Sequence, residues 1–145
     1  MKISTRGRYA LRLMIDLAEH TNGKYITLKD ISARQKISIK YLEQIITQLS
    51  KAGLLKSVRG PQGGYKLSKD SKDYTVGDIL RVTEGNLSPV ACLEYDTNKC
   101  SNYEKCSTVD FWIGLYQSIQ KYVDSVTLED LVSKHISKVT VDFSI

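Results

Sequence analysis

The three cysteines of this chain, Cys92, Cys100 and Cys106, lie within the fifteen-residue segment CLEYDTNKCSNYEKC. Three is an odd number, so disulfide pairing within the chain cannot use all of them. Thiolates clustered in one loop are ligands for soft metals and for iron–sulfur clusters. Zinc is the competing metal, because three cysteines and one nitrogen or oxygen ligand also suit it. The spacing leaves three interpretations open: a cluster, zinc or free thiols.

The length of 145 residues fits one domain or two small ones. Arg8, Arg12 and Asp16 interrupt the opening segment, which therefore does not resemble a signal peptide. No stretch approaches the roughly 18 apolar residues of a membrane span, so we expect a cytoplasmic protein with no membrane partner. In a reducing compartment a cysteine cluster is more typical of a metal or redox site than of disulfides.

Charge is divided unevenly along the chain. Residues 1–72 carry fifteen Lys and Arg against five Asp and Glu, whereas residues 73–145 carry six against eleven. A basic first half predicts a polyanionic partner, and nucleic acid is the most common one. The alternative is a solvated basic surface.

Three helices are expected in the first half, over residues 5–20, 28–35 and 39–52. Apolar residues recur at spacings of three and four in each, and Ser4, Thr27 and Ser38 are suitable N-caps. The short second helix, the tight turn and the longer third helix form a helix-turn-helix pattern. That pattern alone is a weak signal, because many helical domains contain such a pair.

A predicted β-hairpin follows the third helix. Residues 54–59 and 65–68 read as strands, and the intervening GPQGG segment reads as a turn. A helix-turn-helix followed by a hairpin is the winged-helix arrangement. We therefore expect a mainly α fold with a small β-hairpin, in which a winged helix-turn-helix DNA-binding domain precedes a long dimerisation helix.

The start of a recognition helix presents side chains to base edges in the major groove. Lys40 and Tyr41 could hold phosphate, Gln44 could pair with adenine, and Glu43 could accept a hydrogen bond from cytosine. An arginine at the wing tip could enter a narrow minor groove. The alternative is that Tyr41 belongs to the core and Glu43 pairs with a lysine one turn away. The predicted DNA-binding residues are Ser38, Lys40, Tyr41, Glu43, Gln44, Arg59, Gly60 and Gly63.

The second half contains further predicted helices. Thr75 caps a helix that ends near Thr83, and a long helix covers residues 107–124 with many aromatic residues on its apolar stripe. That stripe predicts a partner-helix interface, and burial within one subunit is the alternative. Thr127 caps one more short helix. The tail is residues 134–145. Within it Val139, Val141 and Phe143 alternate with polar residues, so it is expected either to add as a strand or to stay mobile.

Three segments carry a resemblance to the Rrf family of bacterial winged-helix regulators: KISTRGRYALRLMIDLA, ISIKYLEQIITQLSKAGLLKSVRGPQGGYKL and TVGDILRVTEG. It covers roughly residues 1–133. The resemblance implies a transcription regulator, expected to be a repressor, that binds a pseudo-palindromic operator in double-stranded DNA as a homodimer. An enzyme is not expected, since His20 and His135 are isolated in the sequence and no catalytic pattern occurs. The expected division is 1–83 (winged helix-turn-helix), 84–106 (cysteine loop), 107–133 (dimerisation and C-terminal helices) and 134–145 (tail).

The resemblance also bears on the cysteines. IscR-type members of the family bind a [2Fe–2S] cluster on three cysteines and on a histidine three residues after the last cysteine. That position here is Val109, and the first cysteine gap is longer than usual. Asp110 is then the nearest candidate for the fourth ligand, with His20, His135 or a partner residue as alternatives. Other members use an acidic side chain in the partner's first helix, where this chain has Arg8.

The C-terminal residue, Ile145, carries a free carboxylate. CymR-type members of the family end in a similar way, and their ending resembles the tail that serine acetyltransferase inserts into cysteine synthase. Capture of a C-terminal carboxylate is a known recognition mode. The resemblance therefore implies cysteine synthase as a possible partner, with a frayed end as the alternative.

Overall fold

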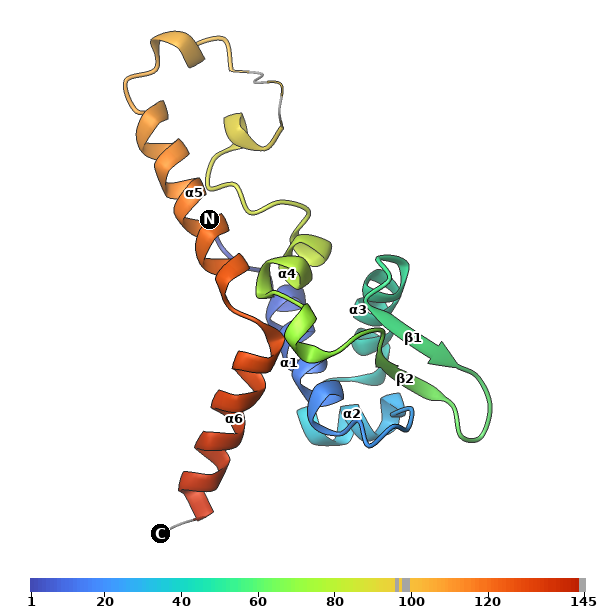
Figure 1. Ribbon diagram of the computed structural model, residues 1–145. Helices are drawn as coiled ribbons and strands as arrows, with labels where there is room; N and C mark the ends of the chain where they lie inside the picture. Colours follow the sequence, from blue (N-terminus) through green and yellow to red (C-terminus); the bar gives the residue numbers. More distant parts are fainter. Residues whose placement is uncertain (96, 98–99, 144–145) are drawn as a thin grey trace.

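The computed structural model describes residues 1–95, 97 and 100–143. It confirms a mostly helical chain with one small hairpin. Helices α1 to α4 and the hairpin form one body, and α5 and α6 lie along one side of it and project beyond it in opposite directions (Figure 1). The segment that carries the cysteines lies at the outer end of α5.

The first three helices begin at the predicted caps. Helix α1 covers Thr5–Glu19, α2 covers Leu28–Gln35 and α3 covers Ile39–Lys51. The hydroxyl oxygens of Ser4, Thr27 and Ser38 accept hydrogen bonds from the backbone amides three residues on. Gly53, just after α3, has a φ of +78°, the left-handed geometry that ends a helix.

The hairpin is slightly shorter than predicted. Strand β1 covers Leu55–Val58 and pairs in antiparallel register with β2, Gly64–Leu67. Tyr65 also exchanges two backbone hydrogen bonds of 2.8 Å with Ile26, which lies between α1 and α2. Leu55 and Leu67 lie opposite each other, and both contact the helical core. The hairpin, which we call the wing, is therefore attached to the body through the Ile26 strand contact and through the core contacts of Leu55 and Leu67.

Tyr74 joins the wing to the remaining helices. Its side chain is fully buried, and its hydroxyl donates to the Leu54 carbonyl at 2.7 Å and accepts from the Ser68 amide at 2.9 Å. Helix α4, Val76–Glu84, follows immediately, and Thr75 and Asp78 cap it reciprocally. The Tyr74 carbonyl accepts from the amide of Leu128, so the start of the last helix is anchored at the same point.

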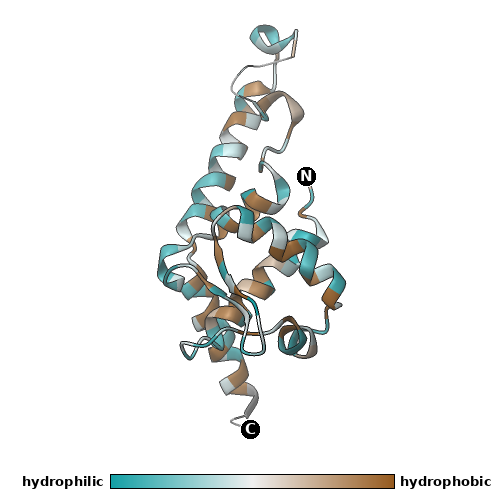
Figure 2. Ribbon diagram, turned by 90° about the vertical axis from the view of Figure 1, so that its right-hand side faces the viewer, coloured by the Kyte–Doolittle hydropathy of each residue, from teal (hydrophilic) through white to brown (hydrophobic). Residues whose placement is uncertain are grey.

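Two short 3-10 turns, Ala91–Leu93 and Tyr103–Lys105, interrupt the cysteine segment. Helix α5 then covers Val109–Ser125, close to the predicted 107–124. It has 17 residues, of which only Val109 is buried in this single chain. Figure 2 shows hydrophobic residues in brown among hydrophilic ones along the long helix, and Phe111, Leu115 and Tyr122 are exposed.

The prediction of a short last helix followed by a separate tail is wrong. Helix α6 covers Leu128–Phe143, so residues 134–143 continue it. Thr127 and Asp130 cap it reciprocally with bonds of 2.9 and 3.0 Å. Leu128 is buried, and His135, two turns on, contacts Glu19 of α1. This contact and the packing of α6 against α1 outweigh the β propensity of the alternating valines. Ile145 lies outside the described residues.

The hydrophobic core lies where α1, α2, α3 and the base of the hairpin meet. Leu13, Met14 and Leu17 of α1 are fully buried there, as are Leu42, Ile45 and Leu49 of α3. No helix in the described part of the chain is long and apolar enough to cross a membrane.

Candidate DNA-binding surface and cysteine loop

Helix α3 has one buried face and one exposed face. Leu42, Ile45, Ile46 and Leu49 are buried against the core. The opposite face presents the exposed side chains of Lys40, Glu43, Gln44 and Thr47. These positions are three or four residues apart, so they form a continuous polar strip on one side of the helix. Lys40, Glu43 and Gln44 were predicted from the sequence.

Thr47 was not predicted. Its hydroxyl donates to the Glu43 carbonyl at 2.7 Å, and its position four residues after Glu43 is the signal that could have identified it. The alternative in which Glu43 pairs with a lysine is not observed, because Glu43 forms no ion pair with any residue that the structure describes. The Glu43 carboxylate therefore lies open to an external donor.

The structure gives Tyr41 a packing role, and its contact with DNA stays a prediction. Its ring is half-buried and meets the ring of Tyr9 edge-on, with centroids 5.7 Å apart. The ring belongs to the margin of the core, as the alternative interpretation held. The Ser38 hydroxyl accepts from the Tyr41 amide at 3.2 Å, which places Ser38 at the very start of the helix.

The wing tip needs glycine for steric reasons. Gly60 has a φ of +112°, and the Gly63 amide donates to the Gly60 carbonyl at 2.9 Å. A Cβ atom at Gly63 would lie against the Val58 carbonyl and 2.9 Å from the Gly60 carbonyl oxygen. Arg59 is exposed beside this tight turn. The hairpin therefore holds an arginine at the end of a narrow, compact projection (Figure 1).

Sequence reasoning missed a charged contact behind this surface. Asp16 is fully buried in α1 and binds Arg34 and Gln35 at the end of α2. The available signal was a single carboxylate within the apolar run of α1, between Met14 and Leu17. A charge in that place requires a partner from another element.

The cysteines lie apart from α3 and the hairpin (Figure 1). Cys92 belongs to the first 3-10 turn of the loop, Cys106 follows the second turn, and Cys100 is exposed between them. In the described part of the chain, no three Cys, His, Asp or Glu side chains converge as metal ligands. Asp110 is exposed and Val109 is buried. The ligand set stays a prediction, because the loop as it lies here does not assemble it.

The thiol of Cys106 is favoured to ionise, which is a property of metal-binding cysteines. Its sulfur lies 3.5 Å from the Thr108 hydroxyl, and hydrogen bonds from the side chain and backbone of Thr108 lower the pKa of the Cys106 thiol. A lower pKa favours the thiolate, which is the form that binds metal. Cys92 borders a cavity of about 320 Å³ that Tyr95, Tyr103, Ile113 and Tyr116 also line. Three thiols in one loop suit a [2Fe–2S] cluster in donor chemistry.

Both histidines lie away from the cysteine loop within this chain. The His20 Nδ1 atom is 2.8 Å from the Asp16 carbonyl, and His135 contacts Glu19. These contacts lie where α1 meets α6, whereas the loop is at the far end of α5 (Figure 1). Neither histidine is placed to complete a ligand set with the cysteines of its own chain.

Comparison with known proteins identifies the family. The model described as Rrf2, iron-dependent transcriptional regulator, matches residues 3–134. The chain belongs to the Rrf2 family of transcriptional regulators. It is 43% identical over 133 residues to CymR of Bacillus subtilis, covering 92% of this chain and 91% of that protein. It is 37% identical over 132 residues to IscR of Vibrio atlanticus, and the match covers 91% of this chain and 75% of that protein.

Solved structures agree with the sequence relatives of this Rrf2 protein. The structure titled CymR, the global cysteine regulator of B. subtilis, gives a TM-score of 0.75 at 40% identity and covers 92% of this chain and 98% of its own. The T. potens IscR structure gives a TM-score of 0.72 at 40% identity, and the match covers 93% of this chain and 88% of the IscR chain. These relatives confirm the winged-helix fold and the assignment as a DNA-binding transcription regulator rather than an enzyme. They do not separate an IscR-like from a CymR-like role.

Proposed function

We propose that this Rrf2 protein binds a pseudo-palindromic operator as a homodimer, with α3 in the major groove and the wing in the adjacent minor groove. The observation that carries the proposal is the polar strip of α3 lying open beside the wing. Lys40 and Glu43 form no ion pair with any described residue, and Arg59 is exposed at the wing tip. Side chains that lack internal partners are available to DNA.

Each side chain has a distinct part in this proposal. The Lys40 ammonium binds phosphate, and the Gln44 amide can donate to and accept from adenine in a bidentate pair. Glu43 accepts from the amino group of cytosine and disfavours bases that present an acceptor there. Arg59 enters the minor groove, where a narrow width strengthens the negative potential. Gly60 and Gly63 allow the wing backbone to approach the phosphates.

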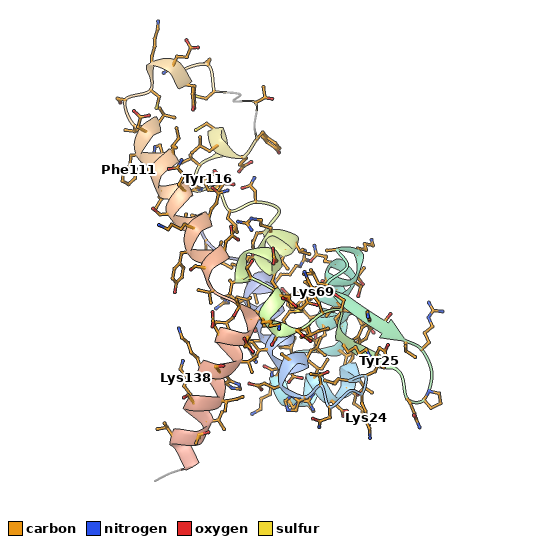
Figure 3. All side chains as sticks on the ribbon, in the orientation of Figure 1. Lys24, Tyr25, Lys69, Phe111, Tyr116 and Lys138 are labelled. Atoms are coloured by element: carbon orange, nitrogen blue, oxygen red, sulfur yellow. The ribbon has the colours of Figure 1, made fainter. Side chains whose placement is uncertain are left out.

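Helix α5 supports a dimer. The side chains of Phe111 and Tyr122 are 64% and 68% exposed, and Leu115 is also exposed. Phe111 lies on α5 well away from the winged body (Figure 3). So much aromatic surface on a projecting helix favours a second copy of the same helix as its partner. Two copies would also place two recognition helices on one duplex, as a pseudo-palindromic site requires.

Binding to DNA can be tested by selection from a random duplex library, followed by fluorescence anisotropy on the selected sequence. The expected loss for Arg59→Ala is about 1–3 kcal/mol of binding free energy. Lys138→Ala is the control, because Lys138 is an exposed cation on α6 and lies outside both the proposed DNA-binding surface and the proposed dimer helix. A parent protein that selects no sequence, or equal binding by Arg59→Ala, would contradict the proposal.

The cysteine loop is proposed as the sensing element, with Cys92, Cys100 and Cys106 holding a [2Fe–2S] cluster and Asp110 as the fourth ligand. The lowered pKa of Cys106 and the IscR-named relatives support this assignment. A bound cluster would supply a redox-sensitive charge to the loop. The test is the visible spectrum of protein purified without oxygen. Absorbance bands that disappear in each Cys→Ala variant are expected, and a colourless, zinc-containing sample would contradict the cluster.

A second candidate role follows from the C-terminal helix. Helix α6 extends beyond the body as far as Phe143 (Figure 1), and CymR of B. subtilis is among the relatives. On this proposal Ile145 docks into cysteine synthase through its carboxylate. Calorimetric titration against cysteine synthase should show binding by the full chain and none after removal of Ile145. Equal binding with and without Ile145, or none in either case, would exclude this role.

A further inference from the structure

Asp16 is a buried charge. Its side chain has no exposed surface, and it is the only charged residue that is buried in the described part of the chain. Its neighbours on α1 include the fully buried Leu13 and Leu17. Removing a carboxylate from water is costly unless well-placed partners compensate. The partners of Asp16 are therefore strongly constrained in position.

The side-chain hydrogen bonds to the Asp16 carboxylate come from the last turn of α2, and His20 Nδ1 lies 3.7 Å from its Oδ1. Arg34 donates from Nη2 to Oδ1 at 2.8 Å and from Nε to Oδ2 at 3.0 Å, which is a bidentate pair. Gln35 donates from Nε2 to Oδ2 at 2.8 Å. The hydrogen bond to Asp16 raises the pKa of Arg34 above its usual value, which shows that the pair favours the charged guanidinium. One carboxylate on α1 thus holds two consecutive residues of α2.

A second residue of α1, Arg12, also binds the end of α2. Arg12 lies one turn before Asp16, and its Nε donates to the Gln35 side-chain oxygen at 3.2 Å. Its Nη2 donates to the Gln35 backbone carbonyl, one of the acceptors that a helix end leaves without a helical partner. Gln35 is the last residue of α2, so the helix end itself is fixed to α1.

The turn after Gln35 is short and rigid. Lys36 has a φ of +55° and is the only non-glycine residue with positive φ in the described part of the chain. The Ser32 hydroxyl donates to the Ile37 carbonyl at 2.6 Å. Ser38 then caps α3, which begins at Ile39. A displacement of Gln35 would therefore be transmitted to the first turn of α3.

We propose that Asp16 is a positioning residue for DNA recognition. It fixes the end of α2 on α1 and thereby sets the angle at which α3 presents Lys40 and Glu43. The inference rests on the proposed function, because those side chains are its DNA contacts. Asp16 itself does not touch DNA, since it has no exposed surface.

A merely stabilising role is the competing explanation, and the chain contains a matched control. Asp124 on α5 forms the same kind of bidentate pair with Arg81 on α4, at 2.7 and 2.9 Å. That pair joins α4 to α5, and its hydrogen bonds reach neither α2 nor α3 in the described part of the chain. Asp16→Asn and Asp124→Asn therefore remove the same charge from bidentate pairs in different places, with Asp16 fully buried and the Asp124 side chain 45% exposed.

The experiment measures three quantities for each variant: urea unfolding, the amide NMR shifts of Ile39 to Glu43, and anisotropy with the selected duplex at temperatures where the variant is folded. Asp16→Asn should move those amide shifts and weaken DNA binding at least tenfold. The salt dependence of binding should be unchanged, because no phosphate contact is lost. Asp124→Asn should leave both the shifts and the affinity close to those of the parent.

Additional variants keep the test decisive if Asp16→Asn fails to fold. Gln35→Ala removes side-chain contacts to Asp16 and Arg12 but leaves the Arg34 pair in place. It should also weaken binding while the protein stays folded. The double variant Asp16→Asn/Arg34→Gln should bind no more weakly than Asp16→Asn, because the two residues act through one contact.

The proposal is overturned if folded Asp16→Asn and Gln35→Ala bind within about twofold of the parent. It is also overturned if Asp124→Asn loses as much affinity, because the loss would then not be specific to the contact between Asp16 and the end of α2. If the parent binds no duplex, the proposed function fails. The amide shifts still decide the positioning role in that case, since unchanged Ile39 to Glu43 signals in Asp16→Asn would exclude it.

Discussion

The guanidinium of Arg81 on α4 holds the carboxylate of Asp124 on α5 through two hydrogen bonds of 2.7 and 2.9 Å. This pair joins the winged body to the long projecting helix. Gly77 lies beside it, and a Cβ atom at that position would collide with the Asp124 carboxylate. The close approach of the two helices therefore depends on a glycine and on a charged pair together.

Asp124→Asn is expected to reduce stability by about 1 kcal/mol or less at pH 7, because the pair is partly exposed and therefore screened. Hydrogen bonding to Arg81 lowers the pKa of Asp124 in the folded state. This contribution is present above the unfolded pKa of about 3.9 and is lost as pH falls through the lower folded value. Urea unfolding below pH 4 should show a shallower acid loss in the variant than in the parent. Parallel curves would contradict this assignment.

Gly63→Ala should distort the wing. The added methyl group would press on the Val58 and Gly60 carbonyls, so the turn must open at a cost of roughly 1–3 kcal/mol. DNA affinity should fall together with stability, because Arg59 moves when the turn opens. Thermal unfolding and anisotropy measure the two effects. Gln62→Ala is the neighbouring control, since its side chain is exposed, and it should unfold like the parent.

Two substitutions of Tyr41 should separate its packing role from a contact between its hydroxyl and DNA. Tyr41→Ala removes the ring that packs edge-on against Tyr9, and we expect a loss of about 1–3 kcal/mol in stability. Tyr41→Phe keeps the ring and removes only the hydroxyl. If the hydroxyl binds phosphate, Tyr41→Phe should unfold like the parent yet bind DNA more weakly. Unchanged DNA binding by Tyr41→Phe would restrict Tyr41 to a packing role.

Much of the fold follows from local signals in the sequence. Ser4, Thr27, Ser38 and Thr75 are strong caps, and each begins a helix where predicted. The extent of α6 could not be predicted in this way. Its residues from Val139 to Phe143 alternate as in a strand, and they continue a helix here because α6 packs against α1, where His135 meets Glu19. A contact between residues so distant in the chain leaves no local signal.

Part of the candidate site could likewise be predicted from local sequence signals, and part could not. Lys40, Glu43 and Gln44 follow from the period of a helix whose apolar face is evident in the sequence. The Asp16 contact with Arg34 does not, because it depends on how α1 and α2 cross. The geometry of the cysteine loop also lacks a local signal, since thiol spacing alone does not fix how a long polar segment folds.

Thr108→Val should raise the pKa of the Cys106 thiol in metal-free protein. Hydrogen bonds from the Thr108 side chain and backbone lower that pKa, and the substitution removes the side-chain bond. Thiolate, not thiol, reacts with iodoacetamide, so the pH profile of Cys106 alkylation should shift to higher pH in the variant. Peptide mass spectrometry follows Cys106 separately from Cys92 and Cys100. Identical profiles would show that Thr108 does not act on Cys106.

The central claim is that the exposed strip of α3 reads bases, and Glu43→Ala tests it most directly. The measurement is the binding of parent and variant to the selected duplex and to every single-base substitution of it. The variant should lose discrimination at one position in each half-site, where a mismatch costs the parent about 1–3 kcal/mol, and keep its preferences elsewhere. A base-preference profile identical to that of the parent would contradict the account.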